Sequence, residues 1–237
     1  MRRLALTFTF LVVPLAAVGC GSSGSDTASS ASVPAASSPA ASAPADTQAA
    51  STGGCQTVQA PAPRKAGGEK KPTQKLDAGK TYTVTVETNC GTFAFKLDVK
   101  DSPDTTAAFA GLVKRGYFDN LTFHRIVPGF VIQGGDPKGT GEGGPGFSTV
   151  DPPPKNADYK LGVVAMAKTQ TEPDGAAGSQ FFVVTAQDAQ LPPQYALLGN
   201  VTKGIDVVKK IGELGNPTDP NGTPTQVVVM KKVTVSP

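Results

Sequence analysis

The residues best suited to chemistry in this chain of 237 residues stand together at 123–136, in the stretch FHRIVPGFVIQGGD. His124, the only histidine, could act as a general acid or base, and Arg125 beside it could donate hydrogen bonds to a developing charge. A nucleophilic hydrolase would pair His124 with a serine or cysteine, and the sequence has no Gly-x-Ser-x-Gly turn. A single histidine in an apolar run is more typical of a packed side chain.

A glycine-rich run follows at 139–144, GTGEGG, and matches the G-x-G-x-x-G pattern of dinucleotide-binding loops. That pattern binds a pyrophosphate where a helix opens at its last glycine. Here Pro145 follows directly, and three consecutive prolines at 152–154 exclude a helix soon after. We therefore interpret the run as a long surface loop.

Composition limits the partners and cofactors. The chain has 22 Lys and Arg, 19 Asp and Glu, three cysteines and one histidine. A net charge of +3 is too weak to indicate nucleic acid as a partner. Three cysteines and one histidine do not suggest a structural zinc site. We expect no metal, no cofactor and no nucleic-acid partner.

The N-terminus has the features of a signal peptide, predicted at residues 1–19. Two arginines precede an apolar run from Leu4 to Val18, which at ~1.5 Å per residue is too short for a ~30 Å bilayer core. The run ends in AVGC, and small residues before Cys20 resemble the lipobox of bacterial lipoproteins. That resemblance implies lipidation of Cys20, with palmitate as one acyl group, and anchoring on the extracytoplasmic face of the cell membrane. An ordinary secretory signal cleaved near Gly19 is the alternative.

Residues 20–75 are predicted to form a disordered, flexible tether. The part from 21 to 54 consists mainly of Ser, Ala, Pro, Thr and Gly, a composition that buries too little surface to offset the entropy of ordering. The part from 61 to 75 contains five basic residues. It is either a solvated linker or a segment attracted to an anionic surface.

Cys55 and Cys90 remain as a pair if Cys20 carries lipid. Outside the cytoplasm such a pair favours a disulfide. It would join the end of the tether to the first hairpin, with a contribution of at most ~3–4 kcal/mol in the loop-entropy model.

A folded domain is expected from residue 76 to residue 237. Alternating apolar residues at 82–87 and 93–97 flank the turn residues 89–91 and predict a hairpin. Helices are expected from Pro103 to Arg115, with Ser102 as the cap, and from 204 to 214. Short strands are expected at 130–132, 163–167, 181–185, 197–201 and 225–235. This pattern indicates a mainly β domain, a barrel with helices at its ends.

Four blocks carry a resemblance to a known family: FHRIVPGFVIQGGD at 123–136, LGVVAMAK at 161–168, GSQFFVVTA at 178–186 and LLGNV at 197–201. In this order and spacing they resemble the cyclophilin family of peptidyl-prolyl cis/trans isomerases, over roughly residues 80–235. The resemblance implies a closed eight-stranded antiparallel barrel capped by two α-helices. It also implies an isomerase that acts on proline-containing polypeptides, and we expect a monomer.

The resemblance also implies roles for individual residues. Arg125 would be the catalytic arginine, Gln133 would hold it, and Phe130 would complete the catalytic group. The remaining positions would bind the substrate, either in the proline pocket or along the peptide backbone: Val131, Met166, Ala167, Lys168, Gln180, Phe182, Leu191 and Tyr195. Without the resemblance, Arg125 would be interpreted as half of a surface salt bridge and the phenylalanines as core.

Four positions depart from the common pattern of the family. Val131 stands where many members have methionine, Lys168 replaces a common asparagine, Gln190 stands at a tryptophan position and Tyr195 at a histidine position. The missing tryptophan puts cyclosporin binding in doubt, and catalysis less so. A proline-peptide binding or chaperone module without catalysis is the rival hypothesis, and a structural domain of an envelope complex is a third.

Overall fold

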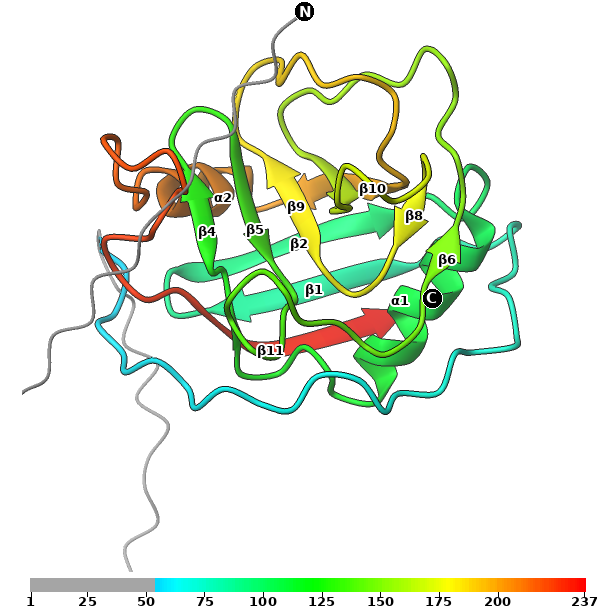
Figure 1. Cartoon of the computed structure of the whole chain (residues 1–237), viewed down its shortest axis with the longest axis horizontal. Coiled ribbons are helices and arrows are strands. Elements are labelled where there is room, and N and C mark those ends of the chain that lie inside the picture. The colour runs from blue at the N-terminus through cyan, green and yellow to red at the C-terminus, as the bar shows by residue number, and fades with distance from the viewer. Residues whose placement is uncertain (1–53) are drawn as a thin grey trace, which may run out of the picture. The chain divides into compact units, whose positions relative to one another are not determined.

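The computed structural model describes residues 54–237, which form eleven strands and two helices (Figure 1). The predicted signal peptide, Cys20 and the tether up to residue 53 lie outside the described residues. Neither helix of residues 54–237 has the length and apolar character needed to cross a membrane. The elements are β1 (Thr83–Thr88), β2 (Gly91–Leu97), α1 (Pro103–Lys114), β3 (Leu121–Thr122), β4 (Arg125–Val127), β5 (Val131–Gly134), β6 (Thr149–Val150), β7 (Val163–Met166), β8 (Ala176–Ala177), β9 (Phe181–Val184), β10 (Leu197–Lys203), α2 (Ile205–Gly212) and β11 (Val229–Ser236).

One antiparallel sheet of nine strands, in the order β3-β11-β1-β2-β10-β7-β9-β5-β4, dominates the described residues. The edge strands β3 and β4 follow each other in the chain, yet they do not pair. The C-terminal segment takes up donors near this edge instead, since Phe123 N donates to Val228 O at 2.9 Å and Ile126 N to Gly222 O at 2.7 Å. The sheet is therefore curled and open, and the expected closed eight-stranded barrel is not observed.

The main core lies between the inner face of the sheet and the two helices. The predicted hairpin is confirmed as β1 and β2, and its alternating residues Val84, Val86, Phe93 and Phe95 are fully buried. A second hydrophobic cluster, on the other face of the sheet, consists of Val131, Tyr159, Val163, Ala165, Phe182 and Val184. Strands β7 and β9 are buried on both faces, which explains why their sequences are continuous apolar runs.

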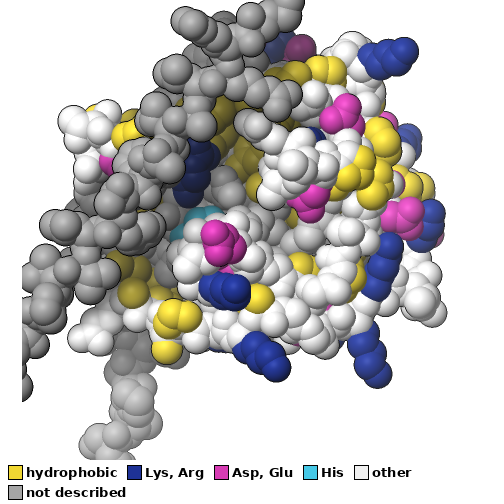
Figure 2. All heavy atoms as spheres, viewed as in Figure 1, with side chains coloured by type: hydrophobic (Ala, Val, Ile, Leu, Met, Phe, Trp, Pro, Cys, Tyr) yellow, Lys and Arg dark blue, Asp and Glu magenta, His cyan; other side chains and the backbone are white. Residues whose placement is uncertain are grey.

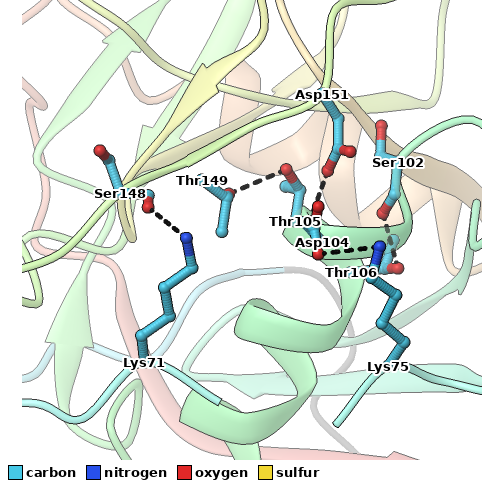
Figure 3. A network of polar contacts seen from close by, with 9 residues as sticks. All are labelled: Lys71, Lys75, Ser102, Asp104, Thr105, Thr106, Ser148, Thr149 and Asp151. Carbon is cyan, nitrogen blue, oxygen red and sulfur yellow. Dashed lines mark hydrogen bonds and ion pairs between the residues drawn. The ribbon is translucent and has the colours of Figure 1, made fainter. Parts of the chain in front are cut away.

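Helix α1 begins at Pro103 as expected, but it is capped differently. The Ser102 side chain makes no capping hydrogen bond. Asp151, far along the chain, accepts a hydrogen bond from Thr105 N at 2.6 Å in the first turn (Figure 3). A carboxylate suits the positive end of a helix better than a hydroxyl does. The cap is therefore a tertiary contact, which local sequence does not reveal.

Residues 54–75, which we call the arm, lie along the surface of the domain instead of forming the flexible tether expected there (cyan in Figure 1). Arg64 N donates to Pro137 O at 2.7 Å, and Pro72 packs so closely on Gly111 of α1 that a Cβ there would overlap it. The prediction rested on composition, because the five basic residues at 61–75 suggested a solvated linker. Backbone hydrogen bonds and charged side chains hold the arm instead, and composition does not count these.

Basic side chains of the arm bind the domain. Lys71 Nζ donates to Ser148 O at 3.0 Å, and Lys75 Nζ forms an ion pair with Asp104 at 3.2 Å (Figure 3). The Arg64 guanidinium donates to Tyr117 O, so three of the five basic residues at 61–75 have partners within the domain. Attraction of this segment to an anionic surface stays a prediction.

The arm begins at a disulfide between Cys55 and Cys90, which are 35 residues apart in the chain. Next to it, Gln56 N donates to Asn89 O at 2.8 Å, and the Asn89 side-chain amide donates to Gln56 O at 2.7 Å. The same Asn89 side chain accepts from Val229 N at 2.8 Å, so the arm, the first hairpin and β11 meet at one point.

We predict that reduction of this disulfide lowers the free energy of unfolding by about 3 kcal/mol, because the unfolded chain regains the entropy of an open loop. Urea unfolding with and without dithiothreitol measures the difference. The double variant Cys55→Ser/Cys90→Ser is the control and should not respond to the reductant. Equal stability of the wild-type protein in both conditions would contradict the prediction.

Candidate active site

The site is built on a row of side chains that crosses three neighbouring strands. In the antiparallel register Arg125 of β4 stands opposite Gln133 of β5, and Gln133 stands opposite Phe182 of β9. Directly opposed residues project to the same face of a sheet. Three residues that span 57 positions in the chain, from 125 to 182, therefore lie side by side on the outer face.

The turn between β4 and β5 places Phe130 beside this row. Phe130 N donates to Val127 O at 3.1 Å, and Gly129 has φ +67°, which suits the glycine of a type II turn after Pro128. Phe130 O then accepts hydrogen bonds from Thr185 N and Ala186 N at the end of β9. Both the N–H and the carbonyl group of Phe130 are therefore hydrogen-bonded, which fixes the backbone that carries the aromatic ring.

A cleft of about 220 Å³ lies over the row, and we call it the small cleft. One side of it is polar and charged, and the other is aliphatic and aromatic. The small cleft is lined by Arg125, Phe130, Val131, Gln133, Ala167, Lys168, Phe182, Leu191 and Tyr195. The structure therefore brings nine of the eleven predicted site residues into one cavity.

Tyr195 forms part of the rim, and a buried tyrosine holds it there. Tyr159 Oη donates to Tyr195 O at 2.7 Å and accepts from Tyr195 N at 3.0 Å. The ring of Tyr195 packs edge-on against Phe182, with the centroids 5.5 Å apart. Burial raises the pKa of Tyr159 to about 12, so its hydroxyl stays protonated as the donor. No sequence motif marks Tyr159, because its role depends on a residue 36 positions away.

A chain of side-chain amides connects Arg125 to the glycine-rich loop, residues 139–148. Arg125 Nη1 donates to Gln133 Oε1 at 3.4 Å, and Gln133 Nε2 donates to Gln180 Oε1 at 3.0 Å. Gln180 Nε2 in turn donates to the carbonyl groups of Gly141 and Gly143 at 2.7 and 3.0 Å. Each amide accepts on one side and donates on the other, so the direction of the whole chain is set.

A larger cleft of about 510 Å³ adjoins the small one and shares Gln133, Ala167 and Lys168 with it. Gln180 lines this larger cleft together with the glycine-rich loop. Lys168 stands at the border between the two cavities. Its Nζ donates to Thr169 O and Glu172 O at 3.1 Å and lies 5.9 Å from the centre of the Tyr195 ring.

One of the eleven predicted site residues, Met166, lines neither cleft. Its side chain is buried in the main core with an exposed fraction of 1%, so Met166 could contact a peptide only through its backbone, and the predicted role of this edge in binding the peptide backbone stays a prediction. Met166 alternates with Ala165 along β7, so its side chain points to the inner face. Gln190, at the family's tryptophan position, lines neither cleft and has φ +50°.

His124 is a packed neighbour, as the sequence indicates. Both ring nitrogens are buried and have no hydrogen-bond partner within residues 54–237. Burial lowers the pKa of His124 below its usual 6.5, although the charge of Asp136 acts in the opposite direction. The imidazole is therefore neutral near pH 7 and lines neither cleft.

Charged side chains do not gather into a patch of one sign on the face in Figure 2, where acidic, basic and hydrophobic side chains are interspersed. The alternative reading of Arg125 as half of a surface salt bridge finds no support, since Arg125 forms no ion pair among the residues that the structure describes. Its guanidinium is available to a ligand in the small cleft.

Comparison with known proteins agrees with this geometry. Residues 83–235 match the family model of the cyclophilin type peptidyl-prolyl cis-trans isomerases. A peptidyl-prolyl cis-trans isomerase of Arabidopsis thaliana is 38% identical over 140 residues, which cover 57% of this chain and 84% of the relative. One of Helicobacter pylori is 36% identical over 138 residues, 57% of this chain and 83% of the relative.

A solved structure is similar over the same region. It is that of a cyclophilin type isomerase of Cryptosporidium parvum crystallised in the presence of the dipeptide Ala-Pro, with a TM-score of 0.59 and 30% sequence identity. The similarity covers 65% of this chain and 99% of that one. Because the family model spans more than half of the sequence, and the row of Arg125, Gln133 and Phe182 lies within it, the chain belongs to the cyclophilin-type peptidyl-prolyl cis-trans isomerases.

Proposed function

We propose that this cyclophilin-type isomerase accelerates rotation about X-Pro bonds in proteins that fold outside the cytoplasm, and that a lipid on Cys20 anchors it to the cell membrane. The presence of Arg125 and the aromatic walls in one small cleft carries the catalytic part of the proposal. The residues before Cys20 and the predicted signal peptide support the anchoring.

The reaction breaks no bond, and this decides what the site must do. Rotation about a peptide bond is slow because the nitrogen lone pair is delocalised, with a barrier of ~18–20 kcal/mol. The cis and trans isomers of an X-Pro bond differ by only ~0.5–1 kcal/mol. A catalyst therefore has to bind the twisted amide more tightly than either planar form. It needs neither a nucleophile nor a proton shuttle.

Arg125 is proposed to stabilise the twisted amide directly. In the twisted state the prolyl nitrogen becomes pyramidal and can accept a hydrogen bond, which a charged guanidinium is suited to donate. Such a bond contributes ~1.5–3 kcal/mol, or roughly ten- to a hundredfold in rate. Gln133, which accepts from Arg125 Nη1, is proposed to keep the guanidinium turned toward the small cleft.

The apolar side of the cleft is proposed to bind the proline ring and exclude water. Phe130, Phe182 and Leu191 line it. Water stabilises the planar amide, which is more polar than the twisted one, so a dry wall adds to the effect of the guanidinium. Val131 adds apolar surface at the methionine position of the family.

A binding module without catalysis is the second candidate, because Lys168, Gln190 and Tyr195 depart from the family pattern. Two of these departures lie at the edge of the small cleft, and Gln190 lies outside it. Neither Lys168 nor Tyr195 interrupts the hydrogen bond from Arg125 to Gln133. We therefore favour a change in peptide preference over a loss of catalysis.

We predict that the full chain accelerates cis/trans exchange of a short X-Pro peptide and that Arg125→Ala reduces kcat/KM roughly ten- to a hundredfold. Exchange spectroscopy by NMR measures this. Arg125→Lys is the matched control: it keeps a positive charge but loses the planar donor group, so we expect intermediate activity. Peptide binding by the wild-type chain without any acceleration would favour the second candidate.

A pH profile tests whether His124 takes part as an acid or base. We predict that kcat/KM is flat between about pH 6 and 8 and that His124→Asn retains most of it, because no proton is transferred. A bell-shaped profile that disappears in His124→Asn would contradict the proposed mechanism.

Stability should depend on the same histidine. The lowered pKa of His124 means that the unfolded chain takes up a proton before the folded chain does. Its contribution to stability is therefore complete above pH 6.5 and is lost as the pH falls below that value. Urea unfolding at several pH values should show this decline in the wild type and a shallower one in His124→Asn.

Anchoring has a separate test. We predict that labelled palmitate enters the full chain expressed in a bacterial host and that Cys20→Ser abolishes the label and releases the protein from the membrane fraction. Cys55→Ser is the matched control and should keep the label. Labelling of the Cys20→Ser variant would refute lipidation at that residue.

A further inference from the structure

The glycine-rich loop, residues 139–148, forms one wall of the larger cleft although little in its own sequence holds it in place. Five of its ten residues are glycines, and the described chain forms no helix or strand between β5 and β6. Glycines lose more conformational freedom on ordering than other residues, and they offer no side chain to pack. Phe147 packs against the main core at the end of the loop, and the position of the glycine-rich part before it depends on hydrogen bonds to its backbone.

The inner side of the loop is held by two side chains. The Asp136 carboxylate accepts hydrogen bonds from Thr140 N at 2.9 Å and Gly141 N at 2.6 Å. Burial acts to raise the pKa of Asp136, but the backbone donors outweigh it and the net shift is downward, so the group stays charged. Gln180 then holds the carbonyl groups of Gly141 and Gly143.

The outer side of the loop is held by the arm. Gly67 N donates to Gly144 O at 2.8 Å, Glu69 N donates to Pro145 O at 3.0 Å, and Lys71 binds Ser148 O as Figure 3 shows. The two backbones touch, since a Cβ on Gly146 would lie 3.0 Å from Gly67 Cα. The loop is thus held between the arm on one side and Gln180 on the other.

The arm is itself fixed on the domain near these contacts. The Arg64 guanidinium donates to Tyr117 O and lies 5.8 Å from the centre of the Tyr117 ring. The Glu69 carboxylate forms an ion pair with Arg115 at 2.9 Å. With the disulfide at its start, the arm has attachments on either side of the residues that contact the loop. It can therefore act as a support.

We propose that arm residues 64–71 position the active site by pressing the glycine-rich loop against Gln180. Gln180 accepts from Gln133, and Gln133 accepts from Arg125, so the support extends by hydrogen bonds to the guanidinium. This inference rests on the proposed role of Arg125. The arm touches no substrate in this scheme, and its residues are positioning residues. The arm lies before the part of the chain that matches the family model, residues 83–235.

Glu69 offers a matched pair of variants in the full chain. Glu69→Ala removes the ion pair with Arg115 but keeps the backbone N–H, whereas Glu69→Pro also removes the N–H that donates to Pro145 O. We expect Glu69→Pro to lower kcat/KM on the order of three- to tenfold, and Glu69→Ala, which loses only a partly exposed ion pair, to lower it much less. The disulfide and the catalytic residues are unchanged in both.

Two readouts separate positioning from a general loss of stability. Amide hydrogen exchange of residues 139–148 should become faster in Glu69→Pro than in Glu69→Ala, while exchange in β1 and β2 stays equal. The side-chain amide resonances of Gln180 should shift in the same variant. Equal exchange, equal resonances and equal kcat/KM in the two variants would overturn the proposal.

A second variant keeps the test decisive if Glu69→Pro does not fold. Lys71→Met removes the donor to Ser148 O and leaves the arm backbone intact, and we expect a smaller change in the same direction. Unchanged loop exchange and kcat/KM in that variant would then refute the proposal. If the wild type itself lacks activity, the proposed function fails. If Arg125→Ala is inactive while the arm variants match the wild type, only the support fails.

Discussion

Antiparallel pairing sets Arg125 opposite Gln133, and Gln133 opposite Phe182, across β4, β5 and β9. Side chains alternate along a strand, so a slip of one residue would turn Gln133 toward the core and Ile132 toward the cleft. Such a slip is costly, because it would bury the polar Gln133 side chain and expose Ile132, which is fully buried in this register. The placement of the Arg125 guanidinium beside an apolar wall therefore depends on the register of the sheet. The packing of the core fixes that register.

The polar part of the site follows a different physical rule. Glutamine side chains cannot pack tightly enough to define their own direction, and here each is oriented by what it donates to and accepts from. Gln133 links Arg125 to Gln180, and Gln180 donates to two carbonyl groups of a loop in which half of the residues are glycine. The polar side of the cleft thus combines rigid strands with a loop whose position depends on its neighbours. The arm is one of those neighbours.

Three differences between expectation and structure have one cause. The arm was expected to be tether, Ser102 was expected to cap α1, and the sheet was expected to close. In each case a contact with a distant segment takes precedence: the arm bonds to the glycine-rich loop, Asp151 caps the helix, and the C-terminal segment takes up donors next to β4. Composition and local patterns describe what a segment can do alone. They do not include partners that are supplied from elsewhere in the chain.

The sequence by itself determined the elements and the chemistry. Alternating apolar residues at 82–97 predicted the first hairpin, and the residues around Pro103 predicted the start of α1. The order of four blocks indicated the family and most residues of the small cleft. These features could be predicted because periodicity and motifs are properties of short stretches of sequence. Only the tertiary structure decided which of these residues share a cavity. It placed Met166 in the core and Tyr159 against the backbone of Tyr195, and it laid residues 54–75 along the surface of the domain. Such outcomes depend on register and long-range hydrogen bonds, which join residues that no local pattern connects.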